Sequence, residues 1–166
     1  MAESSSDTKG PNGEARGAAP EQHVSLRHLY VKDLSFEAPL MPEILEEKGP
    51  EPEIRLNLRT THRGLPEGMT EVVLHVEVRA VVSERTFFLL ELAQAGRFQI
   101  TGFSEEDTNA IIGIDCPGML FPYAREAVSS LIQRGGFPAV LLYPVDFAFL
   151  YRAKRATPAK TTSTEA

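Results

Sequence analysis

A run of alternating side chains at residues 71–82 constrains the fold more than any other feature of the chain. Apolar residues occupy every second position and mostly charged or polar residues the positions between, the period-2 pattern of a β-strand. The apolar face is Val72, Leu74, Val76, Val78, Ala80 and Val82, and the other face is Glu71, His75, Glu77 and Arg79 with Val73 and Val81. A second apolar run, TFFLLELAQAG, follows after Ser83, Glu84 and Arg85. Such a short turn predicts an antiparallel hairpin.

Two segments before this hairpin also alternate. In the first, Leu26, His28, Tyr30, Lys32, Leu34 and Phe36 are expected on one face, and Leu29, Val31, Asp33, Ser35 and Glu37 on the other. A loop with Pro39, Pro42, Pro50 and Pro52 follows, and Ile54, Leu56 and Leu58 then alternate with Arg55, Asn57 and Arg59. Because proline interrupts strands, the two segments are predicted to be separate strands.

Helix signals come after the strands. Ser104 can cap a short helix with Asp107 at the capping-box position, and Asp146 can cap a closing helix. Between them, Phe121, Ala124, Val128, Leu131 and Ile132 recur at helical spacing, with Pro122 in the first turn and Gly135 and Gly136 as the stop. Strands first and helices afterwards predict an α+β domain with helices on one face of an antiparallel sheet.

The two ends of the chain contain too few large apolar residues to offset the entropy of ordering them. We therefore predict a disordered arm at residues 1–23, a single domain at residues 24–152 and a disordered basic tail at residues 153–166. The chain has no apolar run of about 18 residues and no apolar region near its start, so neither a membrane span nor a signal peptide is predicted. A cytoplasmic location is expected, in keeping with the single cysteine, Cys116.

Charge is unevenly distributed. The formal net charge is −6, with the acidic excess between residues 24 and 151 and a basic excess from residue 152 onward. An acidic body repels phosphate backbones, so a nucleic-acid partner is not expected. A basic or zinc-bearing protein partner fits this charge better.

The sequence predicts no catalytic site, metal site or cofactor. Cys116 has only His23, His28, His62 and His75 as possible histidine partners, and a lone cysteine beside proline is typical of a structural residue. His75 and Glu77 could face one metal, but their spacing is also that of any solvated strand face. Glu105, Glu106 and Asp107 fit the positive end of a helix dipole. The protein is therefore not expected to be an enzyme.

The chain has more apolar surface than one small sheet needs. In the fourth strand Phe87, Leu89 and Ala93 oppose Phe88, Leu90 and Leu92, so the strand is apolar on both faces. In a sheet covered by helices on one side, the other face is normally solvated. Either a second subunit or another partner is expected to cover it.

Three stretches together resemble the SecB family of protein-export chaperones. They are YVKDLSFEAP at 30–39, EVVLHVEVRAVV leading into FLLELAQAGRFQITG, and CPGMLFPYAREAVSSLIQRGGFPAVLLYPVDF at 116–147. The resemblance extends over residues 24–151. It implies a four-stranded antiparallel sheet with helices packed on one face, with subunits assembling as a dimer of dimers, a homotetramer. It also implies a chaperone that binds unfolded preproteins without ATP, keeps them competent for translocation and delivers them to the SecA ATPase.

The resemblance implies roles for particular residues. Asp33, Glu37, Leu89 and Glu91 match positions that contact SecA, and Leu90, Leu92 and Gln94 match positions associated with packing and assembly. For client binding, the aromatic residues Phe121, Tyr123, Phe137 and Tyr143 are expected, although core packing explains them nearly as well. The basic C-terminal tail departs from the acidic or polar tail common in the family.

Two other functions stay open. A SecB-like chaperone can be dedicated to another client, such as the antitoxin of a toxin pair. An enzyme on this scaffold would require Cys116 or His75.

Overall fold

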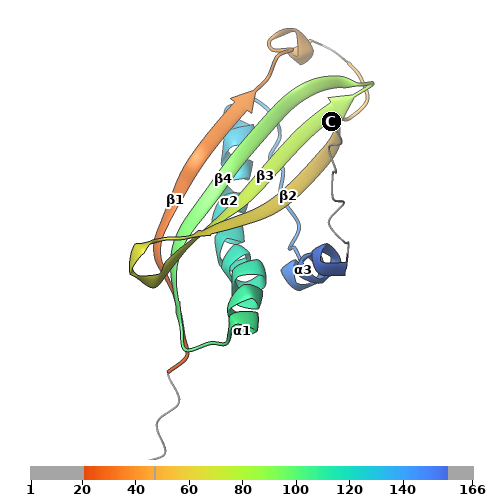
Figure 1. Cartoon of the computed structure of the whole chain (residues 1–166). Helices are drawn as coiled ribbons and strands as arrows, with labels where there is room; N and C mark the ends of the chain where they lie inside the picture. The colour runs from red at the N-terminus through yellow and green to blue at the C-terminus, as the bar shows by residue number, and fades with distance from the viewer. Residues whose placement is uncertain (1–20, 47, 157–166) are drawn as a thin grey trace, which may run out of the picture.

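The computed structural model describes residues 21–46 and 48–156 and has the α+β architecture predicted from the sequence (Figure 1). Its strands are β1 (His23–Glu37), β2 (Glu53–Gly64), β3 (Met69–Val82) and β4 (Arg85–Thr101). They form one antiparallel sheet in the order β1-β4-β3-β2. The helices α1 (Glu105–Ala110), α2 (Cys116–Arg134) and α3 (Phe147–Ala156) follow, and the shorter helical turns are η1 (Glu43–Leu45), η2 (Pro66–Gly68) and η3 (Ile111–Asp115).

The main core lies between the sheet and α2. The apolar face of β3 predicted from the alternation, from Val72 to Ala80, is fully buried there with Phe88, Leu90 and Leu92 of β4. Helix α2 contributes Leu120, Ala124, Val128 and Ile132, which recur every fourth residue and so form one helix face. We call this side of the sheet the helix face and the opposite side the open face. Each buried aliphatic side chain contributes about 1.5–3 kcal/mol, so this contact holds the subunit together.

The β3–β4 hairpin is confirmed, and its turn contains two residues rather than three. Val82 lies opposite Arg85, so Arg85 belongs to β4. Ser83 and Glu84 have φ angles of 45° and 67°. Two consecutive positive φ angles match the twist of a tight hairpin, but this conformation favours asparagine and glycine.

The alternation predicted for β1 is wrong in its middle because the strand contains two β-bulges. Register shifts fall between Leu26 and His28 and between Val31 and Asp33, with Arg27 and Lys32 as the extra residues. Each extra residue reverses the faces of the residues that follow. Leu26, Leu34 and Phe36 therefore lie on the helix face, as predicted, whereas His28, Tyr30 and Lys32 lie on the open face. The bulges thus keep Lys32 out of the core.

Helix α2 begins earlier than predicted. Its first-turn proline is Pro117, and Pro122 lies inside the helix. A proline ring clashes with the carbonyl group four residues before it, which for Pro117 is that of Gly113. The wider π-helical turn η3 includes Gly113 and relieves this clash while the chain stays helical from α1 into α2.

The predicted caps at Ser104 and Asp146 and the predicted stop after α2 are confirmed. The backbone N–H of Asp107 donates to Ser104 Oγ at 3.1 Å, and that of Phe149 donates to Asp146 Oδ1 at 2.8 Å. Helix α2 ends at Arg134 with Gly135 as its C-cap, and Gly136 adopts a φ of 87° that a glycine tolerates.

Strand and helix structure extends slightly beyond the predicted domain. Strand β1 begins at His23, and α3 continues to Ala156, so residues 153–156 are helical rather than part of a tail. Residues 1–20 and 157–166 of the two predicted tails lie outside the described residues. None of the described helices is long and apolar enough to cross a membrane.

Candidate functional site

An acidic patch occupies the open face of β1 and β4. Asp33 lies opposite Ala93, Ser35 opposite Glu91 and Glu37 opposite Leu89. The structure therefore brings Asp33, Glu37, Leu89 and Glu91, the four residues expected to contact a motor protein, onto one face. We call them, with Glu77 of β3, the acidic patch.

Repulsion between carboxylates in the acidic patch is expected to lower the stability of the sheet. Glu77 and Glu91 are directly opposite each other on neighbouring strands, and like charges in this position destabilise a sheet. Arg79 Nη2 lies 3.6 Å from Glu77 Oε1, and Ser35 Oγ donates a hydrogen bond of 3.4 Å to Glu91 Oε2, so part of this repulsion is offset. A cluster of carboxylates that is compensated only in part favours a cationic protein partner.

A single buried carboxylate, that of Glu71, lies on the same face and is surrounded by three hydrogen-bond donors. Glu71 is 3% exposed and accepts hydrogen bonds from Tyr30 Oη, from Lys32 Nζ at 2.7 Å and from Arg63 Nε at 2.6 Å. The hydrogen bonds from Arg63, Lys32 and Tyr30 lower the pKa of Glu71 to about 2. Burial and the hydrogen bond to Glu71 raise the pKa of Tyr30 to about 12. Glu71 therefore remains ionised and ties β1, β2 and β3 together.

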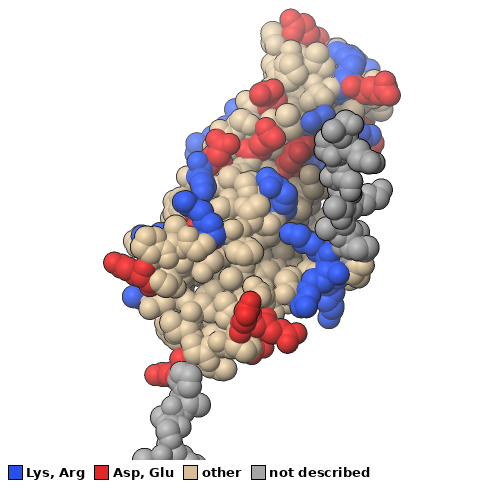
Figure 2. All heavy atoms as spheres, in the orientation of Figure 1, with Lys and Arg blue, Asp and Glu red and all other residues tan. Residues whose placement is uncertain are grey.

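The open face is consequently divided by charge. In Figure 2 red acidic side chains gather over the upper part of the sheet, with some blue ones among them, and blue basic side chains predominate over its middle part. The basic residues of this face include Lys32, Arg59, Arg63 and Arg97, with Glu71 between them. Arg55 and Arg79 also lie on this face, at the acidic end, where Arg79 is opposite Leu89. The carboxylates outnumber them there, so a partner with a basic surface is expected at that end.

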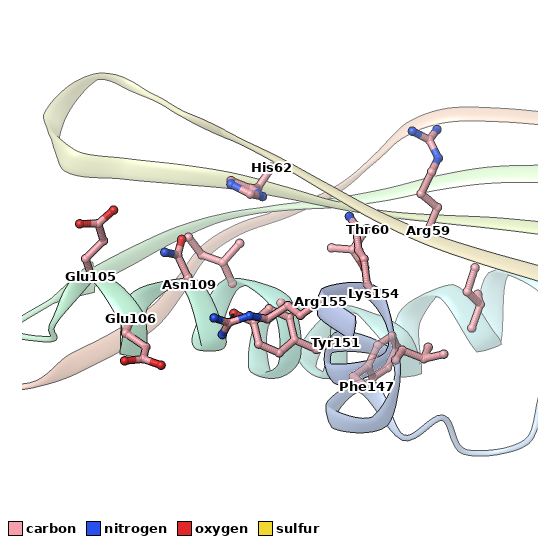
Figure 3. Close-up of a pocket in the computed structure, with 14 residues that line it drawn as sticks. Arg59, Thr60, His62, Glu105, Glu106, Asn109, Phe147, Tyr151, Lys154 and Arg155 are labelled. Carbon is pink, nitrogen blue, oxygen red and sulfur yellow. Dashed lines mark hydrogen bonds between the residues drawn. The ribbon is translucent and has the colours of Figure 1, made fainter. Parts of the chain in front are cut away.

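An open groove of about 1070 Å³ lies on the helix face, between the end of β2 and helices α1 and α3. Its lining is partly apolar, with Leu58 of β2, Ile112 of η3, and Phe147, Leu150 and Tyr151 of α3. Figure 3 shows α3 lying beneath β2, with the ring of Tyr151 beside the helical segment that follows α1, where it packs against Gly113 of η3. Phe147 packs against Phe121 of α2. The volume reaches the upper range for small-molecule pockets, and the groove is open to solvent. It suits part of an extended chain.

The rim of the groove has charges of both signs. Glu105 and Glu106 come from α1, and Lys154 and Arg155 come from α3 (Figure 3). The guanidinium carbon of Arg155 lies 5.6 Å from the centre of the Tyr151 ring, a cation–π contact that holds the arginine on the rim. A rim with charges of both signs is compatible with either sign of charge on a chain that enters the groove.

The four aromatic residues expected to bind clients do not form one site. Phe121 is buried and packs edge-on against Phe147, and Phe137 packs against Phe36 and Phe88. Tyr123 and Tyr143 are exposed, Tyr143 to 87%. None of the four lines the groove. The groove residues Leu58 and Leu150 were missed. The alternation from Ile54 to Leu58 indicated that Leu58 lies on an apolar strand face, but no local pattern connected it to Leu150.

The three residues expected to support assembly are buried within the subunit. Leu90 and Leu92 belong to the core against α2, and Gln94 is 3% exposed. The side-chain amide of Gln94 donates to the backbone carbonyl of Tyr30 at 3.0 Å, next to the second bulge of β1. All three residues therefore lie inside the subunit, where Leu90 and Leu92 are opposite Phe36 and Leu34 of β1 and Gln94 donates a hydrogen bond to its backbone.

The residues considered for chemistry do not form a catalytic or metal site. Cys116 is fully buried in the core on the helix face, and His75 lies on the open face, so the two are not partners. Burial, with a smaller effect of Asp115, raises the pKa of Cys116 to about 12, so the thiol is not nucleophilic. Burial, Arg59 and Lys32 lower the pKa of His75, whose Nε2 lies 3.0 Å from Thr61 Oγ1. Within residues 21–46 and 48–156, no three His, Cys, Asp or Glu side chains gather to hold a metal ion.

Comparison with known proteins gives a consistent result. A family described as preprotein translocase subunit SecB matches residues 17–158. The protein-export protein SecB of Alkalilimnicola ehrlichii is 42% identical over 160 residues, which cover 93% of this chain and 85% of the relative. That of Chromobacterium violaceum is 47% identical over 136 residues, covering 82% and 90%.

A solved structure shares the fold. It is a SecB-like chaperone of Mycobacterium tuberculosis in complex with a peptide from an antitoxin. The TM-score is 0.60 at 16% sequence identity, and the match covers 74% of this chain and 90% of that chain.

Proposed function

The chain belongs to the SecB family of preprotein translocase subunits, and we propose that it holds non-native preproteins without nucleotide or cofactor and delivers them to the SecA motor in the cytoplasm. One observation carries this proposal. The apolar groove and the acidic patch lie on opposite faces of one sheet. A client in the groove therefore leaves the acidic patch free for a second protein. A carrier must bind both partners at once during transfer, and this arrangement allows it.

The client side of the proposal rests on exposed apolar surface. Large apolar side chains are exposed on β2, on α3 and in the segment between α2 and α3; they are Ile54, Leu56, Leu141, Tyr143, Phe149 and Leu150. Such surface is costly for a folded protein and marks a binding site. Contacts of this kind depend little on sequence, as a chaperone for many clients requires.

The motor side of the proposal rests on the acidic patch. We propose that Asp33, Glu37 and Glu91 attract a cationic surface of SecA, and that Leu89 between them provides an apolar contact. Charge complementarity of this kind mainly increases the association rate and weakens with added salt.

We also propose that the subunit assembles as a dimer of dimers. Apolar residues that neither the core nor α2 covers lie along β1 and on the outer side of α2; they are Leu29, Val31, Leu34, Met119 and Tyr123. Their position at one edge of the sheet and on the back of the long helix gives a surface for two further contacts with copies of the chain.

The test compares client holding with motor docking. The purified protein should have the mass of four subunits by light scattering, and it should keep a urea-diluted preprotein soluble without nucleotide. The triple variant Asp33→Asn, Glu37→Gln, Glu91→Gln should hold the client as well as the parent and lose SecA binding. The control variant Glu43→Gln, Glu46→Gln, Glu51→Gln removes three carboxylates elsewhere and should bind SecA normally. A protein that lets the client aggregate contradicts the proposal.

Dedication to an antitoxin is the second candidate. The solved structure with an antitoxin peptide shares only 16% sequence identity with this chain, whereas the export proteins share 42% and 47%. We therefore favour export.

A further inference from the structure

We propose that the open face of one copy of the chain docks on the open face of a second copy, with the acidic patch of each copy against the basic end of the other. We call Lys32, Arg63 and Arg97, which lie around Glu71, the basic patch. A face with one acidic and one basic end is complementary to a second copy of itself that is turned end to end. This contact lies apart from the groove and from the surfaces proposed for the dimer of dimers.

The charges of β4 lie at equal distances from one point. Glu91 is three residues before Gln94 and Arg97 is three residues after it, and both side chains lie on the open face. Between them β4 contributes only Ala93 and Ala95 to this face. A two-fold axis that crosses β4 at Gln94, parallel to the sheet and perpendicular to the strand, places Glu91 of each copy opposite Arg97 of the other. Stacked sheets lie about 10 Å apart, a gap that a glutamate and an arginine side chain span together.

Strand β3 has the same arrangement. Glu71 and Glu77 lie three residues on either side of Leu74, where the axis that crosses β4 at its paired residue also crosses β3. Glu77 of one copy therefore faces the cluster around Glu71 of the other. In that cluster Lys32 and Arg63 share a single carboxylate, and their side chains are 42% and 64% exposed. The excess positive charge there fits Glu77.

Arg97 is the least compensated charge of the basic patch. It lies opposite Glu71 on the neighbouring strand, but Glu71 accepts hydrogen bonds from Tyr30, Lys32 and Arg63 instead. In the described part of the chain no carboxylate lies within 4.0 Å of Arg97, and its Nε is buried without a hydrogen-bond partner. A carboxylate from a second copy gives this guanidinium the ion pair that its own subunit does not.

The size of the face fits a weak, reversible contact. Four strands about 4.8 Å apart and the stretch from Leu89 to Gln99 at about 3.4 Å per residue give roughly 600 Å² on each copy. Two copies then bury on the order of 1,200 Å², the lower end of the range for specific protein contacts. Self-association is therefore expected to depend on protein concentration.

A second copy in this position covers the acidic patch. Self-association and docking of the motor then exclude each other, a consequence that rests on the proposed function. Dilution of the protein should therefore strengthen its binding of SecA. The contact between copies involves neither client nor motor, so its own test does not depend on the proposed function.

Charge-reversed variants test the contact directly. Glu91→Arg gives a face with cations at both ends, and Arg97→Glu gives a face with anions at both ends. Each variant alone should self-associate at least about tenfold more weakly than the parent, because every reversed charge acts twice in a two-fold contact. An equimolar mixture of the two variants should associate again, since the cationic face of one fits the anionic face of the other. Sedimentation velocity of the full-length proteins measures this at about 0.1 M salt, where charges more than about 10 Å apart are largely screened.

Two further variants are the controls. Glu105→Arg makes the same change of charge on α1, away from the open face, and should associate as the parent does. Arg97→Gln adds no carboxylate beside Glu71, so it replaces Arg97→Glu if that variant does not fold, and it should weaken association at least about threefold. Raising the salt to about 1 M should abolish the open-face contact of the parent.

Three outcomes would overturn the inference. They are a parent whose mass does not rise with concentration, a mixture of Glu91→Arg and Arg97→Glu that stays as dispersed as its components, and an association that Arg97→Gln leaves unchanged. A ten-residue peptide of alternating aspartate and glycine, followed by fluorescence anisotropy, identifies the alternative occupant. If it binds the basic patch of a parent that does not self-associate, this end of the face belongs to an acidic foreign partner.

Discussion

Lys32 of β1 and Glu71 of β3 form an ion pair of 2.7 Å that crosses the intervening strand β4. Two features make this contact possible. The second bulge turns Lys32 to the open face, and the residues of β4 on that face, Ala93 and Ala95, are too small to block it. Tyr30 reaches Glu71 across the same alanines. A single buried carboxylate therefore fixes the irregular strand β1 in its register.

Replacement of Glu71 should destabilise the subunit strongly. Glu71→Gln keeps the size of the side chain but removes the charge that Lys32, Arg63 and Tyr30 share. Glu71 is buried, whereas Lys32 and Arg63 are 42% and 64% exposed. Hydrogen bonds to a charged group contribute about 1.5–3 kcal/mol, so we expect a loss of roughly 2 kcal/mol in the free energy of unfolding at pH 7, measured by urea denaturation. The exposed pair Arg55–Glu53 is the control, and Glu53→Gln should change stability by less than about 1 kcal/mol. Equal losses would show that Glu71 has no special role.

The stabilisation by Glu71 should depend on pH in one direction. Its pKa is lowered from an ordinary value of 4.5 to about 2 in the folded protein, because the folded state favours the charged form. The contribution is therefore complete above pH 4.5 and is lost as the pH falls from 4.5 toward 2. The difference in unfolding free energy between the parent and Glu71→Gln should shrink over this range. A difference that stays constant down to pH 2.5 would contradict the lowered pKa.

Replacement of the two residues in the β3–β4 turn should increase the stability of the subunit. Ser83 and Glu84 both have positive φ angles, which cost free energy for residues with ordinary side chains. The double variant Ser83→Asn, Glu84→Gly supplies the residues that this turn favours and should raise the free energy of unfolding by about 1 kcal/mol. Thermal unfolding measures the gain. A lower melting temperature would mean that the turn does not have this conformation.

Two helical glycines should respond oppositely to alanine. A methyl group at Gly113 would overlap the ring of Tyr151, whereas one at Gly118 would meet no atom within 4 Å. Gly118→Ala should therefore stabilise by up to about 1 kcal/mol through helix propensity. Gly113→Ala should displace α3, which is visible as faster amide exchange in residues 147–156. Slow exchange in both variants would contradict the packing of α3 on η3.

The aromatic residues expected to bind clients should separate into two groups. Phe137→Ala removes a ring packed among Phe36 and Phe88 and should cost roughly 3 kcal/mol of stability. Tyr143→Ala removes an exposed ring and should leave the melting temperature unchanged while reducing the retention of an unfolded client in an aggregation assay. A stable Phe137→Ala protein with impaired client retention would restore Phe137 as a binding residue.

The regular parts of the sheet could be predicted from the sequence because their burial follows a simple period. In β3 every second residue faces the core, and no bulge interrupts the count until Ala80. In β1 the same reasoning failed between Leu26 and Asp33, where the two bulges lie. A bulge depends on what the neighbouring strand allows, here the small residues Ala93 and Ala95, and no local pattern in β1 encodes it.

The candidate site was predicted unevenly for a related reason. Asp33 and Glu37 follow the second bulge of β1, and Glu91 of β4 lies opposite Ser35. The strand period and the register therefore place all three side chains on one face. Phe121 and Phe137 have the composition of binding residues, but only packing decides whether an aromatic ring is buried. The groove joins Leu58 to Leu150 across distant elements, and such a contact requires the tertiary fold.

The order of strands in the sheet has a consequence for synthesis. Strand β1 leaves the ribosome first, yet its only neighbour in the sheet is β4, and Leu89, the partner of Glu37, follows roughly 50 residues later. At about 5–20 residues per second, β1 waits for several seconds before it can pair. Through that interval the new subunit is itself a nascent chain with an unpaired strand and exposed apolar side chains. Its own biogenesis thus passes through the condition from which the finished protein is proposed to protect others.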